Sequence, residues 1–427
     1  MKISKAEFIN FRGLTTKGGT EEYRSVKVLD FDPNFNVIIG VNGIGKTSVL
    51  DALAIVLSRI ISRVTPATDK VRRLMPSDIH LGSRFGATIS VDLDFDGLDL
   101  SYSVRGNVSK DFHISRTLNG LEILGSSFDK GASQSRVNSP IAISYTVNRS
   151  SYRLPRKIME VAIGRDAAYQ GALKDKIIDY RSTVSWLLKS QALAHESPKD
   201  EYIFQTVQDA VKRFLPAFGE LEADSDPPRL YIRKNGLTLG IEQLSDGERS
   251  FLSMIIDTAR RLAIANPSSR NPLGEGKGVV LIDELELHLH PKWQRSSVVY
   301  LQKTFPGIQF ITTTHSPFVI QTLRPGQLIN LDPETYDEEY SEYSDQSIED
   351  ITEEVMGVEM PQKSERYKQM MEAAEQYFRI LREEQASSPD EKEAIKRRLD
   401  ELSIPFSDDP AYMALLKVER ETYLGRD

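Results

Sequence analysis

Cysteine is absent from the 427 residues of this chain. Disulfides and thiolate metal sites are therefore excluded, and a chain without cysteine is typical of a reducing compartment. Long apolar runs are missing too: no stretch is long enough to cross a bilayer, and residues 1–7 lack the apolar core of a signal peptide. These absences predict a cytoplasmic protein that does not enter the membrane.

Basic residues are missing from the stretch 332–354, which carries 11 acidic side chains. The whole chain has a net charge of −8, and removing these eleven negative charges leaves +3. Net charge therefore does not decide whether nucleic acid is a partner. The simplest interpretation of the stretch is a solvated acidic linker, which we expect at 331–360.

A glycine-rich loop with the spacing Gly-x4-Gly-Lys-Thr runs from Gly40 to Thr47, between a short apolar strand and an apolar helix. Such a loop turns tightly, so its backbone N–H groups converge on a phosphate at the helix N-terminus. Lys46 would add positive charge at the β- and γ-phosphates, and the Thr47 hydroxyl would bind Mg²⁺. A chance cluster of glycines is the alternative, which the flanking strand and helix disfavour. The predicted ATP-binding residues here are Asn42, Gly43, Gly45, Lys46, Thr47 and Ser48.

Two adjacent carboxylates, Asp283 and Glu284, follow a run of four apolar residues, 279–282. Carboxylates at the end of a buried strand are unfavourable unless they hold a metal or a partner. Asp283 is therefore the predicted Mg²⁺ ligand, and Glu284 the group that polarises the water attacking the nucleotide. An Asp-Glu pair alone is weak evidence, but downstream of a phosphate loop it becomes strong.

A second helix start, Leu244-Ser-Asp-Gly-Glu, offers another anion site. Ser245 is a natural N-cap, and with Gly247 in the first turn the backbone N–H groups and the helix dipole would point at a phosphate. The alternative is an ordinary capping box between Ser245 and Glu248, which the segment favours when taken alone.

His315 follows a predicted buried strand at 310–314 and precedes Ser316-Pro317. Its position, one strand after the Asp-Glu pair, predicts a hydrogen bond to a γ-phosphate. Two further histidines, His288 and His290, stand beside Glu286 and could bind a metal. Their alternation with leucines favours packing instead.

These motifs occur in the order found in ABC-type ATPases. Three segments resemble the SMC/RecF/OLD-like branch of that group: Asn-Phe-Arg-Gly at 10–13, Leu-Ile-Asp-Glu-x-Glu-Leu-His-Leu-His-Pro at 281–291, and Gln-Phe-Ile-Thr-Thr-Thr-His-Ser-Pro at 309–317. Within the branch they look like the AbiEii-like, virulence-associated ATP-binding proteins. That group includes ATPases of bacterial anti-phage modules of the Septu type.

The resemblance covers about residues 1–330 and implies an α/β fold. The expected ABC-type ATPase head has a P-loop mixed sheet, an antiparallel β lobe and a helical lobe inserted at about 156–222. Strand patterns at 2–11, 26–31, 87–95 and 98–104 agree with the β lobe.

The resemblance also implies a head-to-tail homodimer, or a higher homo-oligomer, that encloses two ATP molecules with Mg²⁺. One subunit would supply Lys46, Thr47, Asp283, Glu284 and His315, of which Lys46, Glu284 and His315 would be catalytic. The other subunit would enclose the γ-phosphate with Ser245 and Gly247. Two departures stand out: Tyr145–Arg149 replaces the usual Q-loop glutamine, and His290 stands near the place of the D-loop aspartate.

The tail, 361–427, is predicted to hold two helices with an apolar face on the first. One interpretation is a helical hairpin packed on its own ATPase head. The other is a docking element for a second protein, because so small a unit buries little surface alone. In Septu-type modules the ATPase works with an HNH nuclease, so the resemblance makes this tail the candidate dock.

The leading hypothesis is therefore an ATP-binding and ATP-hydrolysing subunit of a bacterial anti-phage module, which controls an HNH-type partner nuclease and meets DNA through the complex. The chain itself has no nuclease motif. The alternative is a RecF-like ATPase that clamps DNA during repair or recombination. A transporter subunit is disfavoured by the N-terminal strands and the short helical lobe.

Overall fold

The computed structural model describes residues 1–14, 26–81, 83, 86–106, 114–119, 138–147, 164–174, 180–194, 198–215, 218–226, 228–332, 343–358, 365–382 and 389–403. Its residues divide into two compact units, Met1–Ile351 and Thr352–Asp427. The predicted limits of head, linker and tail at 330 and 360 remain predictions.

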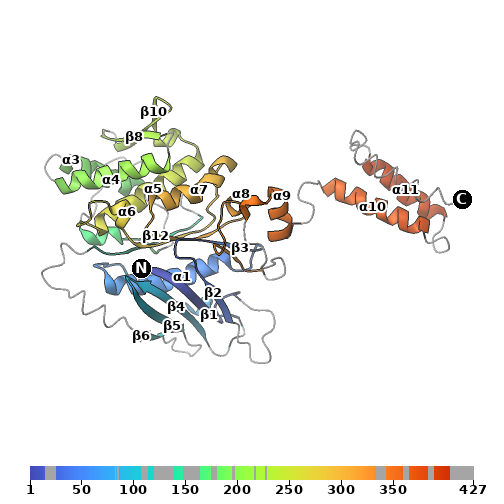
Figure 1. Cartoon of the computed structure of the whole chain (residues 1–427), viewed down its shortest axis with the longest axis horizontal. Helices are drawn as coiled ribbons and strands as arrows, with labels where there is room; N and C mark the ends of the chain where they lie inside the picture. Colours follow the sequence, from blue (N-terminus) through green and yellow to red (C-terminus); the bar gives the residue numbers. More distant parts are fainter. Residues whose placement is uncertain are drawn as a thin grey trace. The chain divides into compact units, whose positions relative to one another are not determined.

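A five-stranded parallel sheet forms the centre of the first unit (Figure 1). Its order is β13-β3-β12-β11-β7, and all four pairings are parallel. Every residue of β3, β7, β11 and β12 is buried, as expected for a parallel sheet that is covered on both faces. The strands are β3 (Phe35–Ile39), β7 (Ile141–Tyr145), β11 (Gly278–Ile282), β12 (Ile308–Thr313) and β13 (Leu328–Asn330).

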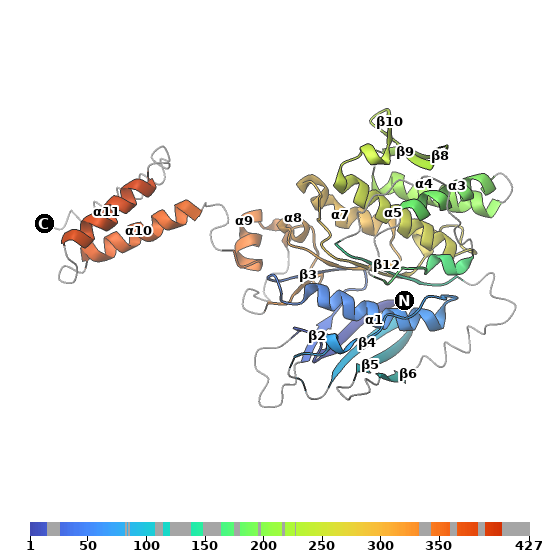
Figure 2. The ribbon, with the colours of Figure 1, turned by 180° about the vertical axis from the view of Figure 1, so that it is seen from behind.

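Helix α1 (Lys46–Val64) lies between this sheet and a second, antiparallel sheet (Figures 1 and 2). Its apolar residues are buried on both faces, because one faces the central sheet and the other faces β4 and β5. The antiparallel sheet has the order β2-β1-β4-β5-β6. Its strands are β1 (Lys2–Ile9), β2 (Val26–Asp30), β4 (Ala87–Phe95), β5 (Leu98–Gly106) and β6 (Ile114–Asn119).

The other face of the central sheet carries the helical lobe (Figure 1). Its helices are α3 (Tyr180–Ala194), α4 (Pro198–Phe214), α5 (Asp246–Ala265) and α7 (Pro291–Thr304), with the short α6 (Pro272–Glu275) and α8 (Pro317–Ile320). A three-stranded antiparallel sheet, ordered β10-β9-β8, caps this lobe. Its strands are β8 (Phe218–Ser225), β9 (Pro228–Lys234) and β10 (Leu237–Gly240).

The last helix within the predicted helical insert at about 156–222 ends at Phe214, and the last residues of the insert form the start of β8. The strand pairs with β9, and the Gln208 side chain of α4 bonds the Leu221 backbone through both its oxygen (3.0 Å) and its nitrogen (2.5 Å). These partners lie outside the segment itself, so local periodicity does not reveal the strand. Residues 156–163 of the predicted insert lie outside the described residues.

Part of the predicted acidic linker is folded. After β13 the chain forms α9 (Ile348–Asp350), and Tyr343 and Ile351 are fully buried. The Gln346 carbonyl accepts a hydrogen bond from Gln321 at 2.8 Å. Residues 343–351 of the predicted linker therefore belong to the folded first unit, whereas residues 333–342 and 359–360 lie outside the described residues.

The second unit contains the two predicted helices, α10 (Glu365–Arg382) and α11 (Pro389–Ser403), packed as a hairpin. Its core is small and consists of Met370, Ala373, Ala374 and Leu399, with Tyr367, Met371, Tyr377 and Leu402 packed around it. Residues 404–427 of the predicted docking region lie outside the described residues. The predicted fold class, an α/β head with an antiparallel β lobe and a helical lobe, is confirmed, but the described strands of the central sheet are all parallel and not mixed as expected.

Membrane-spanning segments were not expected. Among the helices that the structure describes, none has both the length and the apolar composition needed to span a bilayer.

Candidate nucleotide-binding site

The candidate site lies where the parallel strands end. Ile38 of β3 pairs with Thr313 of β12, and Ile282 of β11 pairs with both Thr312 and Tyr145. Since these strands end at one level, the segments that follow them emerge at the same edge of the sheet. Ligands bind at this carboxyl edge in open α/β sheets.

The phosphate loop, Gly40–Thr47, joins β3 to α1 with left-handed backbone at Gly45 (φ 110°). A side chain at Gly45 would be strained by this backbone, and its Cβ would also lie 2.5 Å from Leu14 Cδ2, so that Leu14 would have to move. Gly45 is the N-cap of α1 and provides no side-chain cap. The N–H groups at this helix start therefore face the place where a phosphate would bind.

Lys46 is folded back over the loop. Its Nζ donates to the carbonyls of Gly40 (2.7 Å) and Val41 (3.2 Å), and the residue is 8% exposed. Burial lowers the pKa of Lys46 from its usual value, against the opposing effect of Asp283, Glu284 and Glu286. A phosphate oxygen would give this buried cation a stronger partner than the two carbonyls.

Thr47 and Asp283 meet across the sheet edge. The Thr47 hydroxyl lies 3.0 Å from Asp283 Oδ2, and Asp283 Oδ1 accepts a second hydrogen bond from Thr313 at 2.6 Å. A hydroxyl and a buried carboxylate side by side are oxygen donors suited to Mg²⁺, which keeps few protein ligands and completes its shell with water and phosphate. The donor set therefore fits the predicted metal.

Glu284 follows with a left-handed backbone (φ 49°), which costs about 1–2 kcal/mol in a residue other than glycine. Its N–H donates to the Thr313 hydroxyl at 2.8 Å, and the next residue, Leu285, donates to the Thr313 carbonyl at 2.9 Å. Thr313 thus fixes both carboxylate residues, a role that sequence reasoning missed. The only local signal was the threonine run before His315.

Glu286 is a second missed residue. Its carboxylate accepts hydrogen bonds from the Thr314 hydroxyl and the His315 backbone, both at 2.6 Å, and the His315 side chain is exposed. Among the described residues no group of three or more His, Asp or Glu side chains could hold a metal, so the alternative His–Glu metal site receives no support. His290 instead caps α7, accepting from the Lys292 N–H at 3.2 Å.

Ser245 forms the capping box that was the alternative interpretation. Its hydroxyl accepts from the Glu248 N–H (3.4 Å), and its own N–H donates to Glu248 Oε2 (3.2 Å). Burial opposes ionisation of Glu248, but hydrogen bonds from Lys234 (2.5 Å) and Ser245 outweigh it, and the pKa of Glu248 is lowered. Ser245 and Asp246 remain exposed at the helix start, so the capping box leaves this end of α5 accessible.

Gly247 packs against the loop that follows Glu284. A Cβ at Gly247 would lie 2.2 Å from the His288 carbonyl oxygen, and backbone cannot move aside as a flexible side chain would. We expect Gly247→Ala to displace the start of α5 and to lower the free energy of unfolding by about 1–3 kcal/mol. Thermal melting and ATP turnover measure the effect. Gly13→Ala is the control, because a Cβ at Gly13 meets nothing within 4 Å; equal melting of the two variants would contradict this packing.

Arg12 anchors the Asn-Phe-Arg-Gly segment to α1. Its guanidinium pairs with Asp51 of α1 (2.5 Å) and with Asp78 (2.9 Å), and Arg72 shares Asp51 at 2.7 Å. Sequence reasoning used this segment only as a family marker. In the fold it holds the N-terminal chain, with Leu14, against the phosphate loop.

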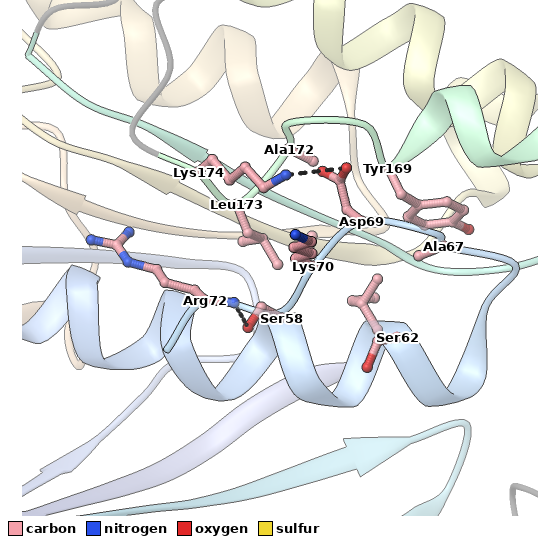
Figure 3. A pocket seen from close by; sticks show the side chains of 12 residues that line it. Ser58, Ser62, Ala67, Asp69, Lys70, Arg72, Tyr169, Ala172, Leu173 and Lys174 are labelled. Carbon is pink, nitrogen blue, oxygen red and sulfur yellow. Dashed lines mark hydrogen bonds and ion pairs between the residues drawn. The ribbon is translucent and has the colours of Figure 1, made fainter. Parts of the chain in front are cut away.

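A small cavity lies along the second half of α1, apart from Lys46 and Thr47 (Figure 3). Asp69 closes one side by pairing with Lys174 at 3.2 Å, and Ser58 accepts the Arg72 N–H at 2.9 Å. Its volume of about 30 Å³ has room for only about two or three water molecules, and it lies apart from the phosphate loop, so it is not the nucleotide site.

Comparisons with known proteins place the chain among related sequences. The family model described as "AAA domain, putative AbiEii toxin, Type IV TA system" matches residues 35–321. The "Retron Ec83 probable ATPase" of Escherichia coli is 29% identical, over 71% of this chain and 68% of that protein. The "Septu protein PtuA" of Bacillus thuringiensis is 23% identical, over 78% and 80%. A solved SMC head bound to the C-winged helix domain of ScpA is 17% identical over 77% of this chain and 94% of that one, with a TM-score of 0.46.

The matched span begins at the first residue of β3 and ends one residue after α8, so it encloses the phosphate loop, the Asp-Glu pair and His315. It also covers well over half of the chain. The chain therefore belongs to the AAA-domain family described as putative AbiEii toxin of type IV toxin–antitoxin systems.

Proposed function

We propose that this chain is the ATP-hydrolysing subunit of a bacterial anti-phage defence module, and that two copies close head-to-tail around ATP to control a partner nuclease. One observation carries the catalytic part: the buried Lys46 and the Thr47–Asp283 pair meet at the carboxyl edge of the parallel sheet, with Glu284 next in sequence.

The side chains divide the reaction between them. Lys46 binds oxygens of the β- and γ-phosphates, and Thr47 with Asp283 would hold Mg²⁺. A metal ion held there would supply positive charge that neutralises the phosphate oxygens. A water attacks the γ-phosphorus, its proton passes to the Glu284 carboxylate, and the bond to the β,γ-bridging oxygen breaks to release ADP and phosphate. Thr313 and Glu286 orient Asp283, Glu284 and His315 through the hydrogen bonds described above.

The start of α5 supports a site built from two subunits. Ser245 and Asp246 are exposed, while the same helix is held within its own chain by Gly247 against His288. The exposed helix start can receive the γ-phosphate bound to another copy. The two half-sites of one chain would then serve two different ATP molecules.

Assignment to defence rests on the relatives. The match with this chain covers 68% of the relative named as a retron probable ATPase and 80% of the relative named as a Septu protein. The partner nuclease, proposed as HNH-type, follows from the resemblance to Septu-type modules. The small α10–α11 hairpin is the proposed dock.

Removal of this hairpin tests the docking role. Truncation after Val358 keeps the folded segment 343–358 and deletes α10 and α11. We expect the truncated chain to hydrolyse ATP within about twofold of the full chain, because the site lies wholly in the first unit, and to lose binding of a co-expressed HNH-type nuclease. Affinity co-purification is the measurement. A nuclease that still co-purifies with the truncated chain would refute the dock.

The RecF-like alternative predicts a different result. A chain that clamps DNA by itself would show ATP turnover stimulated by bare DNA and would purify without a nuclease. Both results together would overturn the proposal of a gated partner.

A further inference from the structure

We infer that Tyr145 is a positioning residue that couples the two half-sites of one chain, joining Asp283 of the phosphate-loop half to α5, which carries Ser245 and Gly247. The inference rests on the proposed function, since it assigns to Tyr145 the regulation of that ATP site. The phenol has no role in the catalytic steps given above.

Tyr145 has contacts at two ends. Its backbone carbonyl, at the end of β7, accepts the N–H of Asp283 at 2.9 Å. Its side chain crosses to α5, where the hydroxyl lies 3.1 Å from Asp257 Oδ2 and 2.9 Å from Thr258 Oγ1. A shift of Asp283 therefore acts through one residue on the helix that begins at the second half-site.

The hydroxyl is suited to hold that contact at any working pH. Tyr145 is 4% exposed, and burial together with Asp257 raises its pKa well above the usual value of 10. The phenol therefore stays protonated and donates. Burial opposes ionisation of Asp257, but Arg261 and Arg260 outweigh it and lower the pKa of Asp257 to about 2, so the acceptor stays charged.

Asp257 is in turn the centre of a buried network. It accepts from Arg260 at 2.9 Å and from Arg261 at 2.7 Å. Arg261 also donates to the Ala168 carbonyl at 2.8 Å, and Arg260 lies over the Trp186 ring of α3 at 5.3 Å. Asp257, which Tyr145 contacts on α5, is therefore linked through its two arginines to Ala168 and to helix α3.

Helix α5 is thus held at two places, by the last residue of β7 and by the segment that follows the neighbouring strand β11. Tyr145 contacts α5 at residues 257–258. The carbonyl of His288, which lies four residues after Glu284, contacts α5 at Gly247. Filling one ATP site would move these strand-end segments and, through α5, reposition the half-site that serves the second ATP. The expected consequence is positive cooperativity between the two sites of the dimer.

Tyr145→Phe cuts the link while keeping the ring, and Asp257 retains both arginine partners. The control is Tyr169→Phe, which removes another buried phenol from the same region. Tyr169 lines the small cavity in Figure 3 and donates to the Pro140 carbonyl at 3.2 Å. The measurement is the ATP dependence of steady-state turnover for the full-length protein, with the Kd for ATP determined separately by equilibrium binding.

For two sites the Hill coefficient is at most 2. We expect the wild type and Tyr169→Phe to show a Hill coefficient above about 1.5, and Tyr145→Phe a coefficient near 1 with turnover lower by about tenfold. The Kd for the first ATP should stay within about twofold, because Lys46 and the phosphate loop are untouched. A merely structural role would change melting and turnover without removing cooperativity.

Thr258→Val serves as the second variant if Tyr145→Phe does not fold. It removes one partner of the phenol and leaves the Asp257 ion pairs in place, so the Hill coefficient should fall in the same direction. Unchanged cooperativity in a folded Tyr145→Phe or Thr258→Val chain, an equal loss in Tyr169→Phe, or a non-cooperative wild type would overturn the inference. Absence of ATP turnover in the wild type would overturn the proposed function and the inference together.

Discussion

Glu284→Gln is expected to lower ATP turnover by at least about 10²-fold, since general base catalysis contributes about 10²–10⁴-fold. The amide keeps the size of the side chain and the Glu284 N–H bond to Thr313, but it cannot accept the proton of the attacking water. ATP binding should persist because Lys46, Thr47 and Asp283 are unchanged. Closed dimers should therefore accumulate in ATP, and phosphate release together with ATP binding measures both effects.

The control for this variant is Glu220→Gln, which neutralises an exposed carboxylate on β8. It should hydrolyse ATP within about twofold of the wild type. Persistent turnover in a folded Glu284→Gln chain would show that another group accepts the proton.

Lys46→Ala is expected to weaken ATP binding by about 10²-fold, because hydrogen bonds to charged groups each contribute about 1.5–3 kcal/mol. Turnover should fall below detection as a consequence. The Lys46 ammonium now bonds only the backbone of its own loop, so its removal should leave the melting temperature close to that of the wild type. Titration calorimetry with ATP gives the affinity directly.

Lys27→Ala is a matched control, since burial also lowers the pKa of Lys27 and its ammonium likewise donates to a backbone carbonyl, that of Leu331. It lies on β2 and is not part of the phosphate loop. If Lys46→Ala binds ATP as tightly as Lys27→Ala does, Lys46 is not a phosphate ligand.

The features that sequence alone predicted are those encoded locally. Lys46 and Thr47 belong to one spaced motif, and Asp283 and Glu284 follow one apolar strand. The sequence therefore predicts both groups of candidate site residues without knowledge of the fold. For the same reason, the alternating pattern predicts strands β4 and β5, and the apolar residues after the phosphate loop predict helix α1, as the structure has them.

The features that sequence missed depend on distant pairing. Thr313 holds Asp283 only because β12 lies next to β11 in one register, and Glu286 reaches His315 across the same edge. Tyr145 meets Asp257 across 112 positions of sequence. Likewise β8 forms because β9 and Gln208 receive its backbone groups. The local periodicity of the sequence does not reveal such contacts between distant residues.

The absence of cysteine allows a direct test of the central claim, that the phosphate loop of one chain and the α5 start of another form one ATP site. Val41 and Asp246 are both exposed, so each can be replaced by a single cysteine, Val41→Cys in one chain and Asp246→Cys in another, both with Glu284→Gln. The two are mixed and treated with a short bis-maleimide. We predict a covalent pair of chains that forms only in the mixture and only with ATP and Mg²⁺. A mixture that gives no ATP-dependent pair would contradict the account.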